Sequence, residues 1–208
     1  MTIATIDALS PELVPGRGGG GPAPTRTVVA YGFWLFIISD ITMFSALFAA
    51  YAVLSGRTAD GPTGSELFNL RHVFIETMCL LLSSYTCGLG ALSAERRQRD
   101  RYLVFAVLTF VLGAAFLYIE VSEFAGMVSR GAGPSRSAFL SAFFTLVGMH
   151  GAHVTAGLIW LTYMMAQVVA KGLRPRVLQR LLCFSLFWHA LDIIWIGVIT
   201  VVYLMGAP

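Results

Sequence analysis

The twenty residues "SAFFTLVGMHGAHVTAGLIW" (141–160) form the centre of an apolar stretch that runs from Ala138 to Ala170. A helix needs about 20 apolar residues to cross the hydrocarbon core of a bilayer. The stretch contains no Asp, Glu, Lys or Arg, but His150 and His153 lie near its middle. It therefore predicts a transmembrane helix, and it raises the question of what two imidazoles do inside it.

The rest of the chain repeats this pattern. Hydrophobic residues make up 57% and charged residues 12% of the 208 positions, and mean hydropathy is +0.76. Soluble domains usually carry about 25% charged residues. The sequence predicts an all-α polytopic membrane protein, a bundle of five transmembrane helices. We expect its spans at about residues 28–54, 73–94, 102–128, 138–170 and 181–205.

The first 26 residues differ from the remainder in composition. They contain four prolines and the run "GRGGGG" (16–21), and they lack the apolar core of a signal peptide. Such a composition does not bury enough apolar surface to fold. We expect residues 1–26 to form a disordered cytoplasmic tail, followed by one membrane domain over residues 27–208.

Basic residues predict the orientation of the bundle, because loops rich in Lys and Arg remain on the cytoplasmic side. Four basic residues would lie on one side: Arg57, Arg71, Arg130 and Arg136. Ten would lie on the other: Arg17, Arg26, Arg96, Arg97, Arg99, Arg101, Lys171, Arg174, Arg176 and Arg180. The N-terminus is thus expected inside and the C-terminus outside. The net charge of +3 reflects this bias and does not indicate nucleic-acid binding.

Several acids and imidazoles interrupt the apolar spans, although ionisable groups at membrane depth are costly and commonly functional. Eight lie in or near the spans: Asp40, Glu76, Glu120, Glu123, His150, His153, His189 and Asp192. Counting depth along each helix predicts hydrogen-bonded layers between helices. The expected pairings are Asp40 with the face of His189 and Asp192, and Glu120 or Glu123 with His150 or His153.

The two histidines of the fourth span are three residues apart and project to nearly one face. Such a pair can chelate a metal ion together, but it cannot hold a haem from both sides. A haem between this helix and His189 is an alternative with less support, and no HExxH, CxxC or CxxCH motif occurs. We interpret the histidines as ties between helices, and we expect no catalytic, cofactor-binding or metal-binding residue in this chain.

The predicted span that contains His150 and His153 also contains several small residues. Gly148, Gly151 and Gly157 lie on the same span. Small residues let helices approach closely in lipid, where packing drives association. The three glycines are therefore candidate helix-packing positions.

Four segments together resemble subunit III of the haem–copper respiratory oxidases. They are "FIISDITMFSALFAAY" (36–51), "ETMCLLLSS" (76–84), "SAFFTLVGMHGAHVTAGLIW" (141–160) and "FWHALDIIWIGVITVVYLMG" (187–206). The resemblance covers all five spans and is strongest to the bo-type ubiquinol oxidase branch. The mitochondrial form has seven spans, and this chain lacks the first two.

The resemblance implies a role that spacing alone does not show. In this family haems and copper belong to subunit I, and subunit III binds phospholipid and protects the catalytic subunit against inactivation. Asp40 matches the family's intramembrane carboxylate. We therefore expect a non-catalytic subunit of a proton-pumping ubiquinol oxidase that reduces oxygen to water. It would assemble with subunits I, II and IV in the bacterial inner membrane.

Three alternatives remain open. The first is subunit III of a five-span cytochrome c oxidase, since no span residue identifies the electron donor. The second is an independent proton-linked transporter, which the buried acids and imidazoles favour but the lack of repeats does not. The third is a haem-bearing membrane enzyme.

Overall fold

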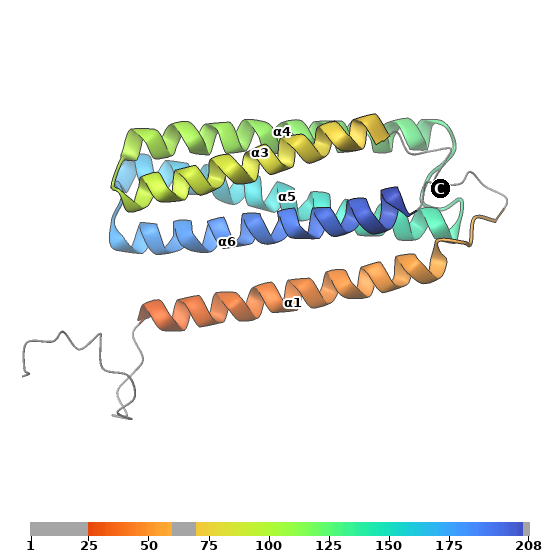
Figure 1. Cartoon of the computed structure of the whole chain (residues 1–208), viewed down its shortest axis with the longest axis horizontal. Helices are drawn as coiled ribbons and strands as arrows, with labels where there is room; N and C mark the ends of the chain where they lie inside the picture. Colours follow the sequence, from red (N-terminus) through yellow and green to blue (C-terminus); the bar gives the residue numbers. More distant parts are fainter. Residues whose placement is uncertain (1–24, 60–69, 206–208) are drawn as a thin grey trace, which may run out of the picture.

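The computed structural model describes residues 25–59 and 70–205, and these residues form long helices that run side by side (Figure 1). The helices are α1 (Thr25–Leu54), α3 (Leu70–Glu95), α4 (Arg99–Ser129), α5 (Ala138–Lys171) and α6 (Pro175–Val198), which continues as the π-helical turn η2 (Ile199–Leu204). Within the described residues, five helices are long and apolar enough to cross a membrane. The prediction of five helical spans is confirmed at this level.

The last helix is longer than its predicted span. It begins at Pro175 rather than near Leu181, because proline fits the first turn of a helix. Val177 in this added segment is buried, so the extra residues also pack against the bundle.

The first helix begins slightly earlier than the predicted membrane domain. It starts at Thr25, so residues 25–26 of the expected tail are helical. Residues 1–24 of that tail lie outside the described residues.

Short turns join the helices from α3 onward, which makes neighbours antiparallel. Arg97 adopts a left-handed conformation, with φ of 59°, in the turn between α3 and α4. Its guanidinium donates a hydrogen bond to the carbonyl of Leu173, and Arg99 donates one to the carbonyl of Val169 at 2.9 Å. These bonds tie the α3–α4 turn to the adjacent end of α5.

Aromatic and aliphatic side chains fill the space between α3, α4, α5 and α6. Trp195 and Phe116 are completely buried, with ring centroids 4.8 Å apart in an edge-to-face arrangement. In contrast, α1 lies to one side of the other four helices (Figure 1) and exposes much of its apolar surface. Apolar surface on the outside of a bundle is the arrangement expected of helices surrounded by lipid.

The bundle has two ends that differ in their turns. We call the end with the turn between α4 and α5 the α4–α5 end. We call the opposite end, with the turns between α3 and α4 and between α5 and α6, the α3–α4 end.

Candidate functional site: polar groups inside the helix bundle

Asp40 of α1 pairs with His153 of α5. Nε2 of His153 lies 3.3 Å from Oδ1 of Asp40, and both side chains are mostly buried. Nδ1 of His153 lies 2.8 Å from the carbonyl of Met149, so this nitrogen carries a hydrogen and donates. A hydrogen bond between Nε2 of His153 and the carboxyl of Asp40 then requires one proton, which is carried either by Nε2 or by the carboxyl. The predicted meeting of Asp40 with His189 and Asp192 is wrong, because the carboxyl of Asp40 is directed to α5.

His150 occupies an aromatic box about one turn away from that pair. Its ring stacks on Trp195, with centroids 5.1 Å apart and planes 28° apart. Phe116 and Phe44 present their edges to it at 5.8 and 6.4 Å. His150 is 0% exposed, and neither ring nitrogen has a hydrogen-bond partner among the described residues. Aromatic packing therefore holds this imidazole in place, and its polar atoms remain unsatisfied.

Glu76 of α3 and Glu120 of α4 are likewise buried, at 0% and 4% exposure. In the described part of the chain, both carboxyl oxygens of Glu76 and Oε2 of Glu120 lack a hydrogen-bond partner. Three carboxyl oxygens thus lie in the described bundle interior without the hydrogen-bond partners that buried carboxyls normally have.

The sequence predicts hydrogen bonds between the glutamates of α4 and the histidines of α5. Across the described residues, no hydrogen bond joins Glu120 or Glu123 to His150 or His153, so that prediction is wrong. The carboxyl of Glu120 instead rests on Gly151, where an added Cβ would lie 2.8 Å from Oε1. The acid therefore contacts the backbone beside the imidazole rather than the imidazole itself.

Glu123 lies about one turn nearer the α4–α5 end and is half-buried. It is within electrostatic range of Glu76 and of two basic groups, the exposed His72 at the start of α3 and Arg130 just beyond the end of α4. Glu123 thus stands between the buried carboxyls and the surface.

His189 and Asp192 lie on the seam between α6 and α3. His189 is exposed, its Nε2 would be 3.8 Å from a Cβ at Gly88, and its Nδ1 donates to the carbonyl of Ser185 at 2.7 Å. Asp192 is half-buried beside Ser84 of α3. Asp192 therefore belongs to an α3–α6 seam, whereas His189 borders both this seam and the space between α1 and α6.

Two tryptophans bond α6 to α3, and these tryptophans were not identified from the sequence as hydrogen-bond donors. The indole of Trp188 donates to Oγ of Ser83 at 3.1 Å, and that of Trp195 donates to Oγ1 of Thr77 at 3.3 Å. The available signal was spacing: the tryptophans are seven residues apart and share a helix face, and the two hydroxyls are six residues apart.

The three candidate packing glycines have different surroundings. A Cβ at Gly157 would lie 2.7 Å from the Trp188 ring, and one at Gly151 would clash with the carboxyl that rests on it. Among the described residues, a Cβ at Gly148 would touch only Phe124, at 3.7 Å, which is an ordinary contact. Close approach thus requires glycine at 157, a side chain at 151 would displace the carboxyl of Glu120, and position 148 has room for a methyl group.

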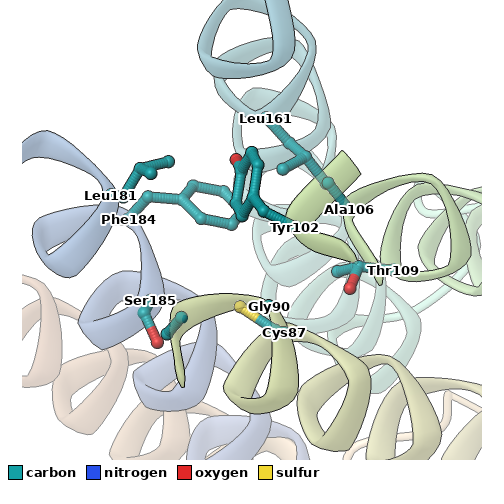
Figure 2. Close-up of a pocket in the computed structure, with 10 residues that line it drawn as sticks. Cys87, Gly90, Tyr102, Ala106, Thr109, Leu161, Leu181, Phe184 and Ser185 are labelled. Carbon is teal, nitrogen blue, oxygen red and sulfur yellow. The ribbon is translucent and has the colours of Figure 1, made fainter. Parts of the chain in front are cut away.

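A small cavity lies between α3, α4, α5 and α6. Its volume is about 20 Å³. Cys87, Tyr102 and Phe184 are among the residues that line it (Figure 2). A volume of this size holds about one water molecule. The Tyr102 hydroxyl is buried without a hydrogen-bond partner in the described chain, so a water molecule there would satisfy it.

A larger groove of about 400 Å³ lies between α1 and α6. Its walls are mostly apolar, with Ser45 and His189 among the few polar side chains. The groove therefore has the character of a surface for hydrocarbon rather than for a polar ligand.

The arrangement of the described polar groups bears on the metal and haem alternatives. Within residues 25–59 and 70–205, no group of three or more His, Cys, Asp or Glu residues is placed to hold a metal ion. A bis-histidine haem between α5 and α6 would require His150 or His153 to face His189, and the Nε2 of His153 is paired with Asp40. His150 instead stacks on Trp195, and His189 lies exposed on the α3–α6 seam.

A helical bundle with an apolar exterior and with acids and imidazoles in its interior defines the chain as a polytopic membrane protein. The family model of cytochrome c oxidase subunit III matches residues 19–207. The chain therefore belongs to the cytochrome c oxidase subunit III family.

Curated relatives cover most of the chain. The cytochrome bo(3) ubiquinol oxidase subunit 3 of Pseudomonas aeruginosa is 52% identical over 85% of both chains. The protein of the same description from Pseudomonas putida is 50% identical over 84% of both chains. The quinol oxidase subunit 3 of Bacillus subtilis is 43% identical over 84% of this chain and 86% of its own length.

Proposed function

We propose that this chain is subunit III of a bo-type ubiquinol oxidase, a non-catalytic subunit of a proton-pumping terminal oxidase that reduces oxygen to water. The observation that carries the proposal is the 52% identity to a ubiquinol oxidase subunit 3 over 85% of both chains. Relatives from Pseudomonas and from Bacillus alike are described as subunits of quinol oxidases. The corresponding location is the bacterial cytoplasmic membrane.

The packing supports an accessory role for this chain. Its buried polar groups bind one helix to another: Asp40 on α1 to His153 on α5, and Trp188 on α6 to Ser83 on α3. The subunit stabilises the catalytic subunit by presenting a firm helical surface within the membrane, and haems and copper belong to subunit I. Subunits II and IV complete the assembly.

The groove between α1 and α6 supports phospholipid binding. Its walls belong to two membrane spans, and it is apolar along most of its length. An acyl chain has the chemistry to fill it, because the surrounding solvent at this depth is hydrocarbon. The variant Ile193→Trp, in the wall of the groove, is expected to lower the amount of phospholipid that co-purifies with the complex.

The basic residues favour an N-terminus inside and a C-terminus outside, with residues 27–208 forming one membrane domain. The α3–α4 end, which carries Arg96, Arg97, Arg99 and Arg101 in or beside one turn, would face the cytoplasm.

Co-purification tests the function. A tagged chain is expected to bring down an oxidase with haem and copper spectra, subunits I, II and IV, and ubiquinol oxidase activity. Oxidation of cytochrome c and a subunit II with a copper-binding cysteine motif would instead identify the five-span cytochrome c oxidase. Recovery of the chain alone, without haem-containing partners, would favour an independent transporter.

A further inference from the structure

Eight buried side-chain polar atoms lack hydrogen-bond partners among the described residues, and five of them belong to three side chains on α3, α4 and α5. These five are the two carboxyl oxygens of Glu76, Oε2 of Glu120, and both ring nitrogens of His150. The three side chains are between 0% and 4% exposed. Buried polar atoms in native proteins nearly always have partners, so unsatisfied ones call for a ligand such as water.

One contact places Glu120 beside His150. The carboxyl of Glu120 rests on Gly151, the residue that follows His150 on α5. The acid of α4 and the imidazole of α5 therefore lie at one level of the bundle.

A second set of contacts brings Glu76 to the same level. Glu76 precedes Thr77, whose hydroxyl accepts the indole N–H of Trp195. The same indole stacks on the ring of His150. These contacts place this turn of α3 at the level of His150, and the side chain of Glu76, which is 0% exposed, lies inside the bundle at that level.

The chemistry of these groups favours protons and water as the ligand. The three side chains do not form a metal-binding group in the part of the chain that the structure describes. An ionised carboxylate is very costly in an apolar interior, whereas a protonated carboxyl is neutral and both donates and accepts hydrogen bonds. Two neutral carboxyls, one imidazole and intervening water can satisfy one another.

A route leads from this region to the surface at the α4–α5 end. Half-buried Glu123 lies on α4 one helical turn beyond buried Glu120, so the two acids share a helix face and Glu123 is the nearer to that end. On the outer side it lies within range of the exposed side chains of His72 and Arg130. The carboxyl of Glu123 is therefore placed between the buried acids and solvent at this end of the bundle.

Other ionisable groups surround the same region. The buried hydroxyl of Tyr203 in η2 lies within electrostatic range of all three glutamates, and His153 lies within range of His150. Chains of ionisable groups that reach into a membrane protein are typical of proton relays.

We propose that Glu76, Glu120 and His150 form one buried proton-binding site that holds water and exchanges protons with solvent through Glu123. In an exchange event a proton leaves a carboxyl of Glu76 or Glu120, passes through water to Glu123 and then to solvent, and a solvent proton returns by the same route. This property goes beyond the accessory role, and its test does not depend on quinol oxidation.

Infrared spectroscopy of the whole oxidase in H₂O and D₂O tests the proposal. Protonated carboxyls absorb above the amide I band and shift downward when deuterated. We expect bands that shift in D₂O and that lose intensity in Glu76→Gln and in Glu120→Gln. Glu95→Gln, at the exposed α3–α4 end of α3, is the matched control and should change neither the bands nor their rate of shift.

The exchange route is tested by the rate of the same shift. We expect Glu123→Gln to slow it by about tenfold or more, because a positioned carboxyl that transfers protons commonly contributes factors of about 10². The bands themselves should remain, since Glu76 and Glu120 are unchanged in this variant.

Three outcomes would overturn the proposal. Absence of the bands assigned to Glu76 and Glu120 would mean that both acids are ionised. Resistance of the bands to deuteration for hours would mean that the site is dry. Equally fast exchange in Glu123→Gln would exclude the proposed route. If Glu76→Gln or Glu120→Gln does not assemble, the aspartate variant at the same position replaces it, because aspartate keeps a carboxyl group. The carboxyl band is then expected at a different frequency from that of the parent complex, and an unchanged band would contradict the proposal.

Discussion

Nε2 of His153 lies 3.3 Å from Oδ1 of Asp40, and this contact joins α1 to α5 inside the membrane. The rest of α1 is largely exposed, and its buried side chains include Phe44, at 1%, and Tyr51, at 2%. Phe44 also packs edge-on against His153, with ring centroids 5.2 Å apart. The Asp40–His153 pair therefore links the peripheral helix α1 to the four central helices.

Replacing Asp40 with Ala should loosen α1 without stopping catalysis. Polar contacts between membrane helices contribute on average about 0.6 kcal/mol, so a small loss of thermal stability of the complex is expected. Initial quinol oxidase turnover should remain mostly intact, because Asp40 lies outside the electron path of the proposed complex. Near-total loss of turnover in a fully assembled Asp40→Ala complex would contradict the accessory role.

Gly157→Leu should strongly reduce the yield of assembled complex, measured by the haem content of purified membranes. Its Cβ alone would lie 2.7 Å from the buried ring of Trp188. Overpacking a core typically costs about 1–3 kcal/mol, so we expect the helices to be forced apart.

Two glycines supply controls for this packing position. No described residue lies within 4 Å of a Cβ added at Gly126 on α4, so Gly126→Leu should assemble normally. Gly148→Ala should also be tolerated, because its methyl group would make only an ordinary contact with the described neighbours. Equal yields of the Gly157→Leu and Gly126→Leu variants would argue against close packing at 157.

The five spans could be predicted from the sequence, since each apolar run is long and the breaks between the runs are polar. The sequence did not allow us to predict which polar residues contact one another across the helices. Depth can be counted along a helix, but the rotation of a helix and its neighbours depend on the packing of all side chains together. Asp40 lies at a depth similar to that of His189 and Asp192 of α6, yet it pairs with His153 of α5.

The tryptophans were not predicted as hydrogen-bond donors, for a related reason. Neutral donors and acceptors carry no charge that marks them as costly in a membrane span, although Trp188 and Ser83 form a buried bond between α6 and α3. The unsatisfied atoms of Glu76 and His150 were also beyond prediction, because a sequence does not reveal which polar groups lack partners within the folded chain.

Membrane orientation can be measured with single cysteines at the two ends of the bundle. Arg136→Cys, between α4 and α5, should react with a membrane-impermeant maleimide in right-side-out vesicles, because the α4–α5 end carries few basic residues. Asp100→Cys, at the start of α4, should react only after permeabilisation. Both positions are exposed, and the parent chain with its native cysteines is the control. The reverse labelling pattern would show that the N-terminus lies outside.

Replacing His150 with Phe should leave the haem content and visible spectrum of the purified complex unchanged. The imidazole is enclosed by the rings of Trp195, Phe116 and Phe44 rather than aimed at a second histidine. His189→Phe should likewise keep the spectrum, and the subunit purified by itself should show no Soret band. Loss of one haem per complex in either variant, with all subunits present, would establish that histidine as a ligand.

Trp188→Phe should destabilise the subunit by removing one hydrogen bond and part of a buried ring. The indole N–H donates to Oγ of Ser83 at 3.1 Å, while the Ser83 hydroxyl donates to the carbonyl of Leu80 at 2.7 Å. Loss of a buried hydrogen bond costs about 0.5–1.5 kcal/mol, so the melting temperature of the complex should fall modestly. Trp34→Phe, at an exposed position on α1, should leave it unchanged.

A double-mutant cycle separates this bond from the packing of the Trp188 ring. Ser83→Ala and Trp188→Phe should each lower stability, and the double variant should lose less than the sum of the two, because both remove the same contact. Strictly additive losses would mean that Trp188 holds α6 against α3 through its ring alone, without a contribution from the indole N–H.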